Sequence, residues 1–122
     1  MRCRRLYMEP MYRMAWKRRS KYRAVRTEVD GFIFHSKKEA ARFVELKLLE
    51  RSGIIKGLQR QVPYILTAHG EKIGKIVMDF VYTQDGVVIY EDVKSKGTIT
   101  PLFRWKAKHF KAQYKVSVTV YL

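Results

Sequence analysis

Two aspartates and a lysine flank a short turn in the second half of the chain, and their side chains are of the kinds found in metal-dependent hydrolytic sites. Asp79 precedes the dipeptide Asp85-Gly86, and Asp92 and Lys94 follow it. An Asp-Gly pair between two apolar runs is typical of a two-residue β-hairpin turn. With that turn, Gln84 faces Val87 across the hairpin. Continuing this register along the two strands places Asp79 directly opposite Asp92. Lys94 then pairs with Val77 and shares the face of both aspartates, because side chains alternate along a strand.

Carboxylates that face each other at about 5 Å repel, so this pair needs a compensating charge. A divalent cation would supply it: Mg²⁺ prefers oxygen ligands, and we expect Mn²⁺ to substitute for it. Such an ion polarises a phosphate and helps to deprotonate water, while Lys94 would orient that water or stabilise the charge on the phosphate. The alternatives are a surface charge pair of Asp92 with Lys94, and an Asp79 that caps a bulge. Glu91 falls on the other face, where a solvated charge is expected.

The strands that would hold these residues follow from alternation and turn signals. Residues 73–82 and 87–94 are predicted as the two strands of the hairpin. Residues 58–66 are predicted as an earlier strand, in which Pro63 indicates an edge or a bulge. A loop around 68–70 separates it from the hairpin.

A helix is predicted before these strands, after a turn and a short extended piece in residues 27–35. Ser36 and Glu39 fit a capping box, the helix ends near Arg51, and Gly53 fits a left-handed C-cap. Its expected core side comprises Ala40, Phe43, Val44 and Leu48.

The second predicted helix begins after Thr100 with Pro101 at its first position and runs to about Gln113. It is amphipathic and basic. Residues 116–121 alternate and are predicted as a closing strand. The element order is therefore helix, three strands, helix, strand.

The segments Met78-Asp79-Phe80 and Glu91-Asp92-Val93-Lys94 resemble the PD-(D/E)xK nuclease superfamily, and the element order resembles its αβββαβ core. The resemblance covers about residues 36–122. It departs from the superfamily pattern at Met78, which stands where the first motif usually has proline. It implies an α/β, restriction-endonuclease-like fold with a mixed central sheet flanked by helices, and a catalytic role for Asp79, Asp92 and Lys94.

Residues 21–56 are similar to small phage-encoded nucleases of resolvase type. That resemblance implies that Glu39 joins Asp79 and Asp92 as a metal ligand and that Gln61 lies near the substrate. The alternative for Glu39 is that it only completes the capping box, and both roles are compatible. The implied activity is that of a Mg²⁺-dependent endodeoxyribonuclease selective for branched DNA, such as a Holliday junction resolvase in phage recombination or DNA processing. Because a junction needs two symmetric cuts and the chain carries one site, we expect a homodimer.

The charge agrees with a nucleic-acid partner. Lys and Arg number 26 against 11 Asp and Glu, a net charge of +15, which attracts polyanions. Residues 1–26 hold ten basic residues and one acidic residue, so we interpret them as a basic N-terminal arm before a nuclease domain at 27–122. Two alternatives exist for residues 1–26: a segment that becomes ordered when it binds a phosphate backbone, and a terminus that stays poorly ordered. The residues expected to contact DNA are Arg18, Arg19, Lys21, Arg23, Lys37, Gln61, Lys96, Arg104 and Lys106.

Other function classes remain open at this point. One is a nonspecific or sequence-specific phage nuclease of the same fold. Another is a non-catalytic nucleic-acid-binding protein, although a binder gains nothing from two acids facing a phosphate. A ribosomal-type coating protein and an anionic-lipid binder also fit the charge.

Several classes are disfavoured by composition. No run of about 18 apolar residues is present, so no membrane span is expected. Cys3 is the single cysteine, which excludes an intrachain disulfide and a thiolate zinc site,. His35, His69 and His109 lack the spacing of metal ligands. A cytoplasmic location, in a bacterial host cell if the protein is phage-encoded, is the expectation.

Deletion of residues 1–19 tests the basic arm. Each phosphate contact contributes a slope of about −0.9 in log affinity against log salt concentration. We therefore expect weaker DNA binding and a shallower salt dependence in anisotropy titrations, with a nearly unchanged cleavage rate at saturating DNA. An unchanged salt slope would show that the arm does not contact DNA.

Overall fold

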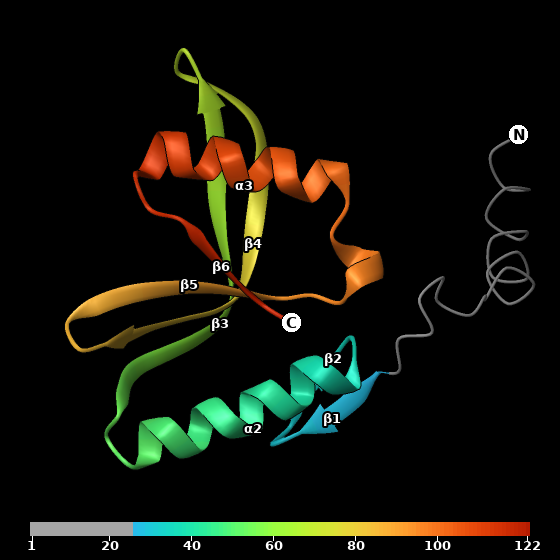
Figure 1. The fold of residues 1–122 in the computed structure, drawn as a ribbon, viewed down its shortest axis with the longest axis vertical. Helices are drawn as coiled ribbons and strands as arrows, with labels where there is room; N and C mark the ends of the chain where they lie inside the picture. The colour runs from blue at the N-terminus through green and yellow to red at the C-terminus, as the bar shows by residue number, and fades with distance from the viewer. Residues whose placement is uncertain (1–25) are drawn as a thin grey trace, which may run out of the picture.

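The computed structural model describes residues 26–122 (Figure 1). From the helix onward, the elements follow the predicted order of helix, three strands, helix and strand. The basic arm, with Arg18, Arg19, Lys21 and Arg23, lies outside the described residues. The elements are β1 (Thr27–Val29), β2 (Phe32–Phe34), α2 (Lys37–Arg51), β3 (Ile55–Ala68), β4 (Glu71–Gln84), β5 (Val87–Val93), the short 3₁₀ helix η1 (Lys96–Thr98), α3 (Pro101–Tyr114) and β6 (Val118–Tyr121).

The central sheet is mixed and has the strand order β3-β4-β5-β6. β4 pairs antiparallel with both β3 and β5, whereas β6 pairs parallel with β5. The predicted mixed α/β architecture is therefore confirmed at this level. Pro63 lies in β3, an edge strand of the sheet, which also agrees with prediction. β1 and β2 form a separate two-stranded hairpin.

The β4–β5 turn has the predicted register. Asp85 and Gly86 both have positive φ angles, 53° and 79°, as a two-residue turn of type I′ requires. Gln84 pairs with Val87, and the same register continues to Phe80 opposite Glu91. Asp79 and Asp92 are the next residues along the two strands.

The β3–β4 pair twists sharply at Asp79. Val62 pairs with Met78 and Arg60 with Phe80, and between them Gln61 has a φ of 53°. Met78 belongs to the core around α3, whereas Phe80 belongs to the core around α2. Residues two apart share a face in a regular strand, so β4 rotates at Asp79. Figure 1 shows both strands changing direction partway along their length.

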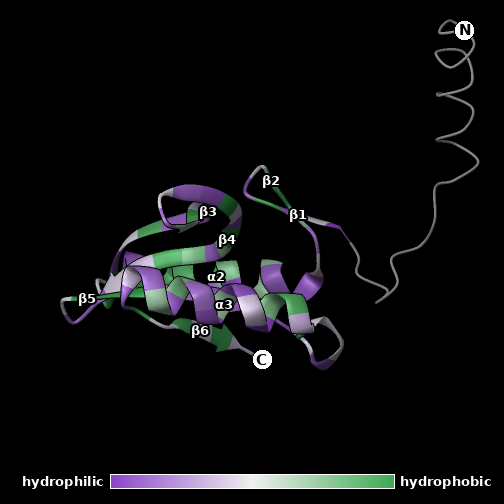
Figure 2. Ribbon diagram, turned by 90° about the horizontal axis from the view of Figure 1, so that it is seen from above, coloured by the Kyte–Doolittle hydropathy of each residue, from purple (hydrophilic) through white to green (hydrophobic). Residues whose placement is uncertain are grey.

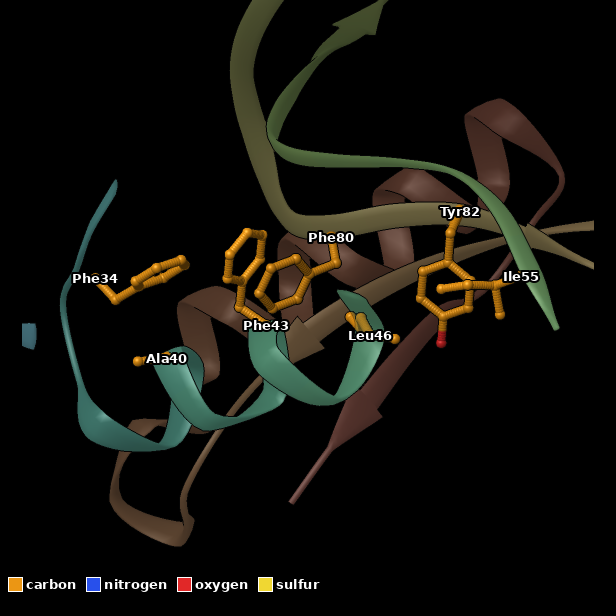
Figure 3. Packing of buried hydrophobic residues seen from close by; sticks show 7 residues of the cluster. All are labelled: Phe34, Ala40, Phe43, Leu46, Ile55, Phe80 and Tyr82. Atoms are coloured by element: carbon orange, nitrogen blue, oxygen red, sulfur yellow. The ribbon is translucent and has the colours of Figure 1, made fainter. Parts of the chain in front are cut away.

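α2 begins and ends as its sequence predicts. The Ser36 side chain accepts a hydrogen bond from the Glu39 N–H at 3.1 Å. At the other end, Gly53 N–H donates to Glu50 O and Ile54 N–H to Leu49 O, which is a Schellman motif. The buried side chains that pack between α2, β2 and the sheet are Phe34, Ala40, Phe43, Leu46, Ile55, Phe80 and Tyr82 (Figure 3).

The prediction that Val44 and Leu48 lie on the core side of α2 is wrong. They are 43% and 55% exposed, whereas Leu46 is fully buried. Apolar residues occur on several sides of this helix, so spacing alone did not define its buried side. The packing of Phe43 against Phe34 and Phe80 does define it.

α3 packs on a second core. Thr100 caps its first turn by accepting the Phe103 N–H at 3.1 Å. Phe110 is fully buried among residues of β3 and β4, namely Leu66, Ile76, Met78 and Val81. Figure 2 shows hydrophobic and hydrophilic residues alternating around its turns, as predicted for an amphipathic helix. α2 and α3 both begin on the same side of the molecule (Figure 1).

Glu91 is not the solvated charge that was expected. It is 1% exposed and accepts two hydrogen bonds from Arg42, from Nε at 2.7 Å and from Nη2 at 3.0 Å. The Tyr82 hydroxyl donates to the same carboxylate at 2.7 Å. Burial and the bond to Glu91 raise the pKa of Tyr82 to about 12. Arg42 lies on α2, far earlier in the chain, so local sequence gave no sign of this partner.

Arg42→Met would leave Glu91 buried without its cation. We expect the free energy of unfolding to fall by about 3–5 kcal/mol, because an unpaired buried charge is costly. Arg42→Met combined with Glu91→Met should recover most of that loss. Urea denaturation at neutral pH measures both variants.

Glu45→Gln is the matched control, because Glu45 is the exposed second partner of Arg42 at 3.2 Å. Its loss should change stability by less than about 0.5 kcal/mol. A single Arg42→Met variant as stable as the parent would contradict the role assigned to the pair.

Candidate active site

Asp79, Asp92 and Lys94 lie together at the open end of the β4–β5 hairpin, away from the turn at Asp85 and Gly86. Asp92 is 4% exposed, and its Oδ2 lies 3.2 Å from Lys94 Nζ. Asp79 Oδ2 accepts the Val93 N–H across the strands at 2.8 Å. The predicted face shared by the three side chains is therefore present.

The predicted pairing of Lys94 with Val77 is wrong. β5 ends at Val93, and the Lys94 N–H instead donates to Tyr121 O of β6 at 2.9 Å. The sharp twist of β4 at Asp79 carries Val77 away from the β5 register. Lys94 is thus positioned by the parallel strand β6.

Gln61 connects Asp79 to Glu39. Its Nε2 donates to Glu39 Oε2 at 3.0 Å and to Asp79 Oδ1 at 3.2 Å. The other Glu39 oxygen accepts the His35 N–H at 3.3 Å, so the capping box is not closed on Ser36 as predicted. Glu39 is 5% exposed, and one of its oxygens caps the start of α2 while the other faces the aspartates.

Burial and the nearby charge of Asp79 raise the pKa values of Glu39 and Asp92. Desolvation, followed by the hydrogen bond and the charge of Asp79, raises the pKa of Asp92 to about 7 against the opposing effect of Lys94. Desolvation and the charge of Asp79 likewise raise the pKa of Glu39. The cluster therefore binds protons more tightly than isolated carboxylates do, which is common at functional sites.

The donor set fits a hard divalent cation with one adjustment. The buried carboxylates present oxygen atoms, the ligands that Mg²⁺ prefers, and a cation would remove the repulsion that raises the pKa of Asp92. Within residues 26–122, no three acidic, histidine or cysteine side chains are grouped closely enough to enclose an ion as they stand. The Gln61 amide lies between Glu39 and Asp79, so rotating it away would open that side.

Two contacts that the sequence did not reveal hold Lys94. Its Nζ lies 4.3 Å from the centre of the Phe103 ring of α3, a cation–π distance. Its carbonyl oxygen accepts a hydrogen bond from Lys38 Nζ at 2.9 Å. Both partners are distant in sequence and occur in no motif, so only the fold brings them to the site.

These residues line one open cleft of about 700 Å³ between the start of α2 and the start of α3. Of the predicted DNA contacts, Lys37, Gln61 and Lys106 line it, whereas Lys96 and Arg104 do not. Sequence reasoning missed His35, Lys38 and Lys75, which also line it. Lys75 is exposed on β4 before the twist, and no local signal linked it to the aspartates.

The fold and the cleft define a mixed α/β domain with an acidic cluster under a rim of lysines. Residues 19–121 match the model of a family described as "Protein of unknown function (DUF1064)", and the chain belongs to that family. No curated protein and no solved structure matches the chain. None of the helices in residues 26–122 has the length and apolar character needed to span a bilayer.

The raised pKa of Asp92 predicts a pH-dependent stability in the presence of a chelator. The folded-state pKa lies above the unfolded value, so the contribution of Asp92 is most favourable at low pH and is lost as the pH rises toward 7,. Asp92→Asn should therefore stabilise the protein at about pH 8, by about 1.4 kcal/mol for each unit of pKa difference. At about pH 4 the same substitution should have little effect.

Urea denaturation at the two pH values measures this difference. Asp85→Asn, which removes an exposed charge from the same hairpin, is the control and should show no such pH dependence. An equal effect of Asp92→Asn at both pH values would contradict the assignment.

Proposed function

We propose that this protein is a Mg²⁺-dependent endodeoxyribonuclease that hydrolyses phosphodiester bonds and is selective for branched DNA, as Holliday junction resolvases are. The observation that carries the proposal is the contact between Asp79 and buried Asp92, with Lys94 at 3.2 Å from the latter. Placing half-buried Asp79 beside buried Asp92 is costly,, and the hydrogen bond from the Val93 N–H to Asp79 does not require a second acid at Asp92. A site that binds a cation and a phosphate accounts for it.

The fold supports the same proposal. The element order, the mixed sheet and the position of the acidic pair at the β4–β5 hairpin agree with the restriction-endonuclease-like αβββαβ core implied by the sequence motifs. Fold likeness alone is a weak argument for function. The arrangement of the side chains therefore carries more weight than the topology.

Each side chain has a distinct role in the proposed reaction. Asp79 and Asp92 would hold Mg²⁺ (or Mn²⁺), with Glu39 joining them once the Gln61 amide turns away. When bound, the ion would polarise the scissile phosphate and lower the pKa of a water molecule. Lys94 is held by Asp92 and Phe103, so its ammonium is positioned to orient the attacking water or to stabilise charge on the phosphate.

The cationic residues of the cleft support selectivity for branched DNA. The cleft has a cationic rim that fits phosphates, and phosphate contacts carry no sequence information. Shape is then the property left to read. Resolution of a junction needs two cuts, and one chain carries one site, so we propose that two copies act together. A nonspecific nuclease of the same fold is the alternative.

A cleavage assay distinguishes these functions. The substrates are a four-way junction, a linear duplex and a single strand, each with Mg²⁺ or with a chelator. Paired nicks in the junction that require Mg²⁺ support the proposal. Equal cutting of all three substrates supports the nonspecific alternative, and metal-independent binding without cutting supports a non-catalytic binder.

Asp79→Asn should abolish cleavage of the junction while DNA binding stays equal or improves, because one negative charge near the phosphate is removed. Lys94→Ala should lower the cleavage rate about 10²–10³-fold at saturating protein. It should leave the stabilisation by Mg²⁺ intact, because lysine is not a metal ligand.

Asp85→Asn removes the same charge from the exposed turn of the hairpin and should cut at the parent rate. Nicking measured by gel under single-turnover conditions decides the outcome. Cutting by Asp79→Asn at near the parent rate would place the metal site elsewhere.

A further inference from the structure

The outward surface of α3 carries a row of cations that the cleft does not use. Arg104, Lys108, Lys111 and Lys115 are all exposed, and in residues 26–122 none of them forms an ion pair. Their spacing of four, three and four residues places them along one side of the helix and its C-cap. We call these four residues the α3 row.

No acidic residue interrupts this surface. α3 contains no Asp or Glu, whereas α2 carries Glu39, Glu45 and Glu50 among its basic residues. Exposed Val44 and Leu48 also place apolar side chains among the charged residues on the surface of α2. Of the two long helices in residues 26–122, α3 is therefore the one with an uninterrupted positive surface.

The row begins beside the cleft and leads away from it. Thr100, Leu102, Phe103 and Lys106, all from the first half of the α3 region, line the cleft, while Lys115 is the left-handed C-cap at the other end. At about 1.5 Å per residue, the row extends about 16 Å. One strand of duplex DNA presents a phosphate every 3.4 Å or so along the axis, so the row spans about five base pairs.

We propose that the α3 row binds the phosphate backbone of the duplex on one side of the scissile bond, over about five base pairs. The position of this duplex relative to the cut rests on the proposed nuclease function. The binding of the α3 row to DNA does not depend on it. Trp105 is 53% exposed next to the row, and its ring would pack against the sugar–phosphate backbone. Duplex DNA is favoured over an anionic membrane because Phe110, at the centre of the apolar side of α3, is fully buried, which leaves only Leu102, Trp105 and Tyr114 of the large apolar residues of α3 exposed.

The first test measures the salt dependence of DNA binding by the full chain in a chelator, so that no cleavage occurs. The variant carries Arg104→Gln, Lys108→Gln and Lys111→Gln, and the matched control carries Lys47→Gln, Arg51→Gln and Lys56→Gln. Three lost phosphate contacts reduce the slope of log affinity against log salt by about 2.7. The parent should therefore lose about 40-fold more affinity than the α3 variant when salt rises fourfold. The control should keep the parent slope.

The second test maps phosphates whose ethylation prevents binding to a four-way junction. We expect a run of about five phosphates on one side of each cut for the parent, and its loss in the α3 variant. A run on both sides, or one unchanged in the variant, would overturn the proposal. Equal salt slopes for the α3 and control variants would also overturn the proposal. So would a loss of binding to phosphatidylserine vesicles by the α3 variant that equals its loss of binding to DNA.

The two proposals fail separately. If the protein cuts no DNA, the proposed function is wrong, yet the salt slopes still report whether the α3 row binds a duplex. If the slopes do not differ while Mg²⁺-dependent cutting is normal, only the assignment of the α3 row is wrong. The control variant keeps Lys94, Asp79 and Asp92 and the whole α3 row, so its cleavage rate at saturating DNA and low salt should match the parent.

Discussion

The repulsion between Asp79 and Asp92 is the constraint around which the rest of the site is organised. The tight turn at Asp85 and Gly86 fixes the register that brings the two carboxylates together. Their surroundings offset the repulsion in separate ways: a backbone N–H and the Gln61 amide bind Asp79, and Lys94 pairs with Asp92. Burial, together with the hydrogen bond and charge of Asp79, still raises the pKa of Asp92 to about 7.

The elements that the sequence predicted well depend on neighbours in the chain. The turn at Asp85 and Gly86, the Ser36 cap and the start of α3 at Pro101 are local hydrogen-bonding or φ requirements, and all were predicted correctly. So were the register of the hairpin and the convergence of Asp92 and Lys94. What escaped prediction depends on distant partners.

Glu91 and the buried side of α2 illustrate those limits. Glu91 is buried because Arg42 reaches it from α2, and no pattern along β5 records that contact. Similarly, apolar residues lie on several sides of α2, so their spacing does not define which side is buried. The packing of the Phe34 and Phe80 rings against Phe43 defines it. The same contacts link the site to the fold, since Glu91 faces α2 while its neighbour Asp92 faces the cleft.

The conformation of Gln61 sets backbone stability against the hydrogen bonds that join the acidic side chains. Its φ of 53° lies in the left-handed region, which costs a residue with a Cβ about 1–2 kcal/mol and costs glycine almost nothing. Selection of variants for heat resistance alone should therefore favour glycine at this position. Glycine would remove the amide that joins Glu39 to Asp79. Gln61 therefore adds strain to the backbone at the position from which its side chain bridges the two acids,.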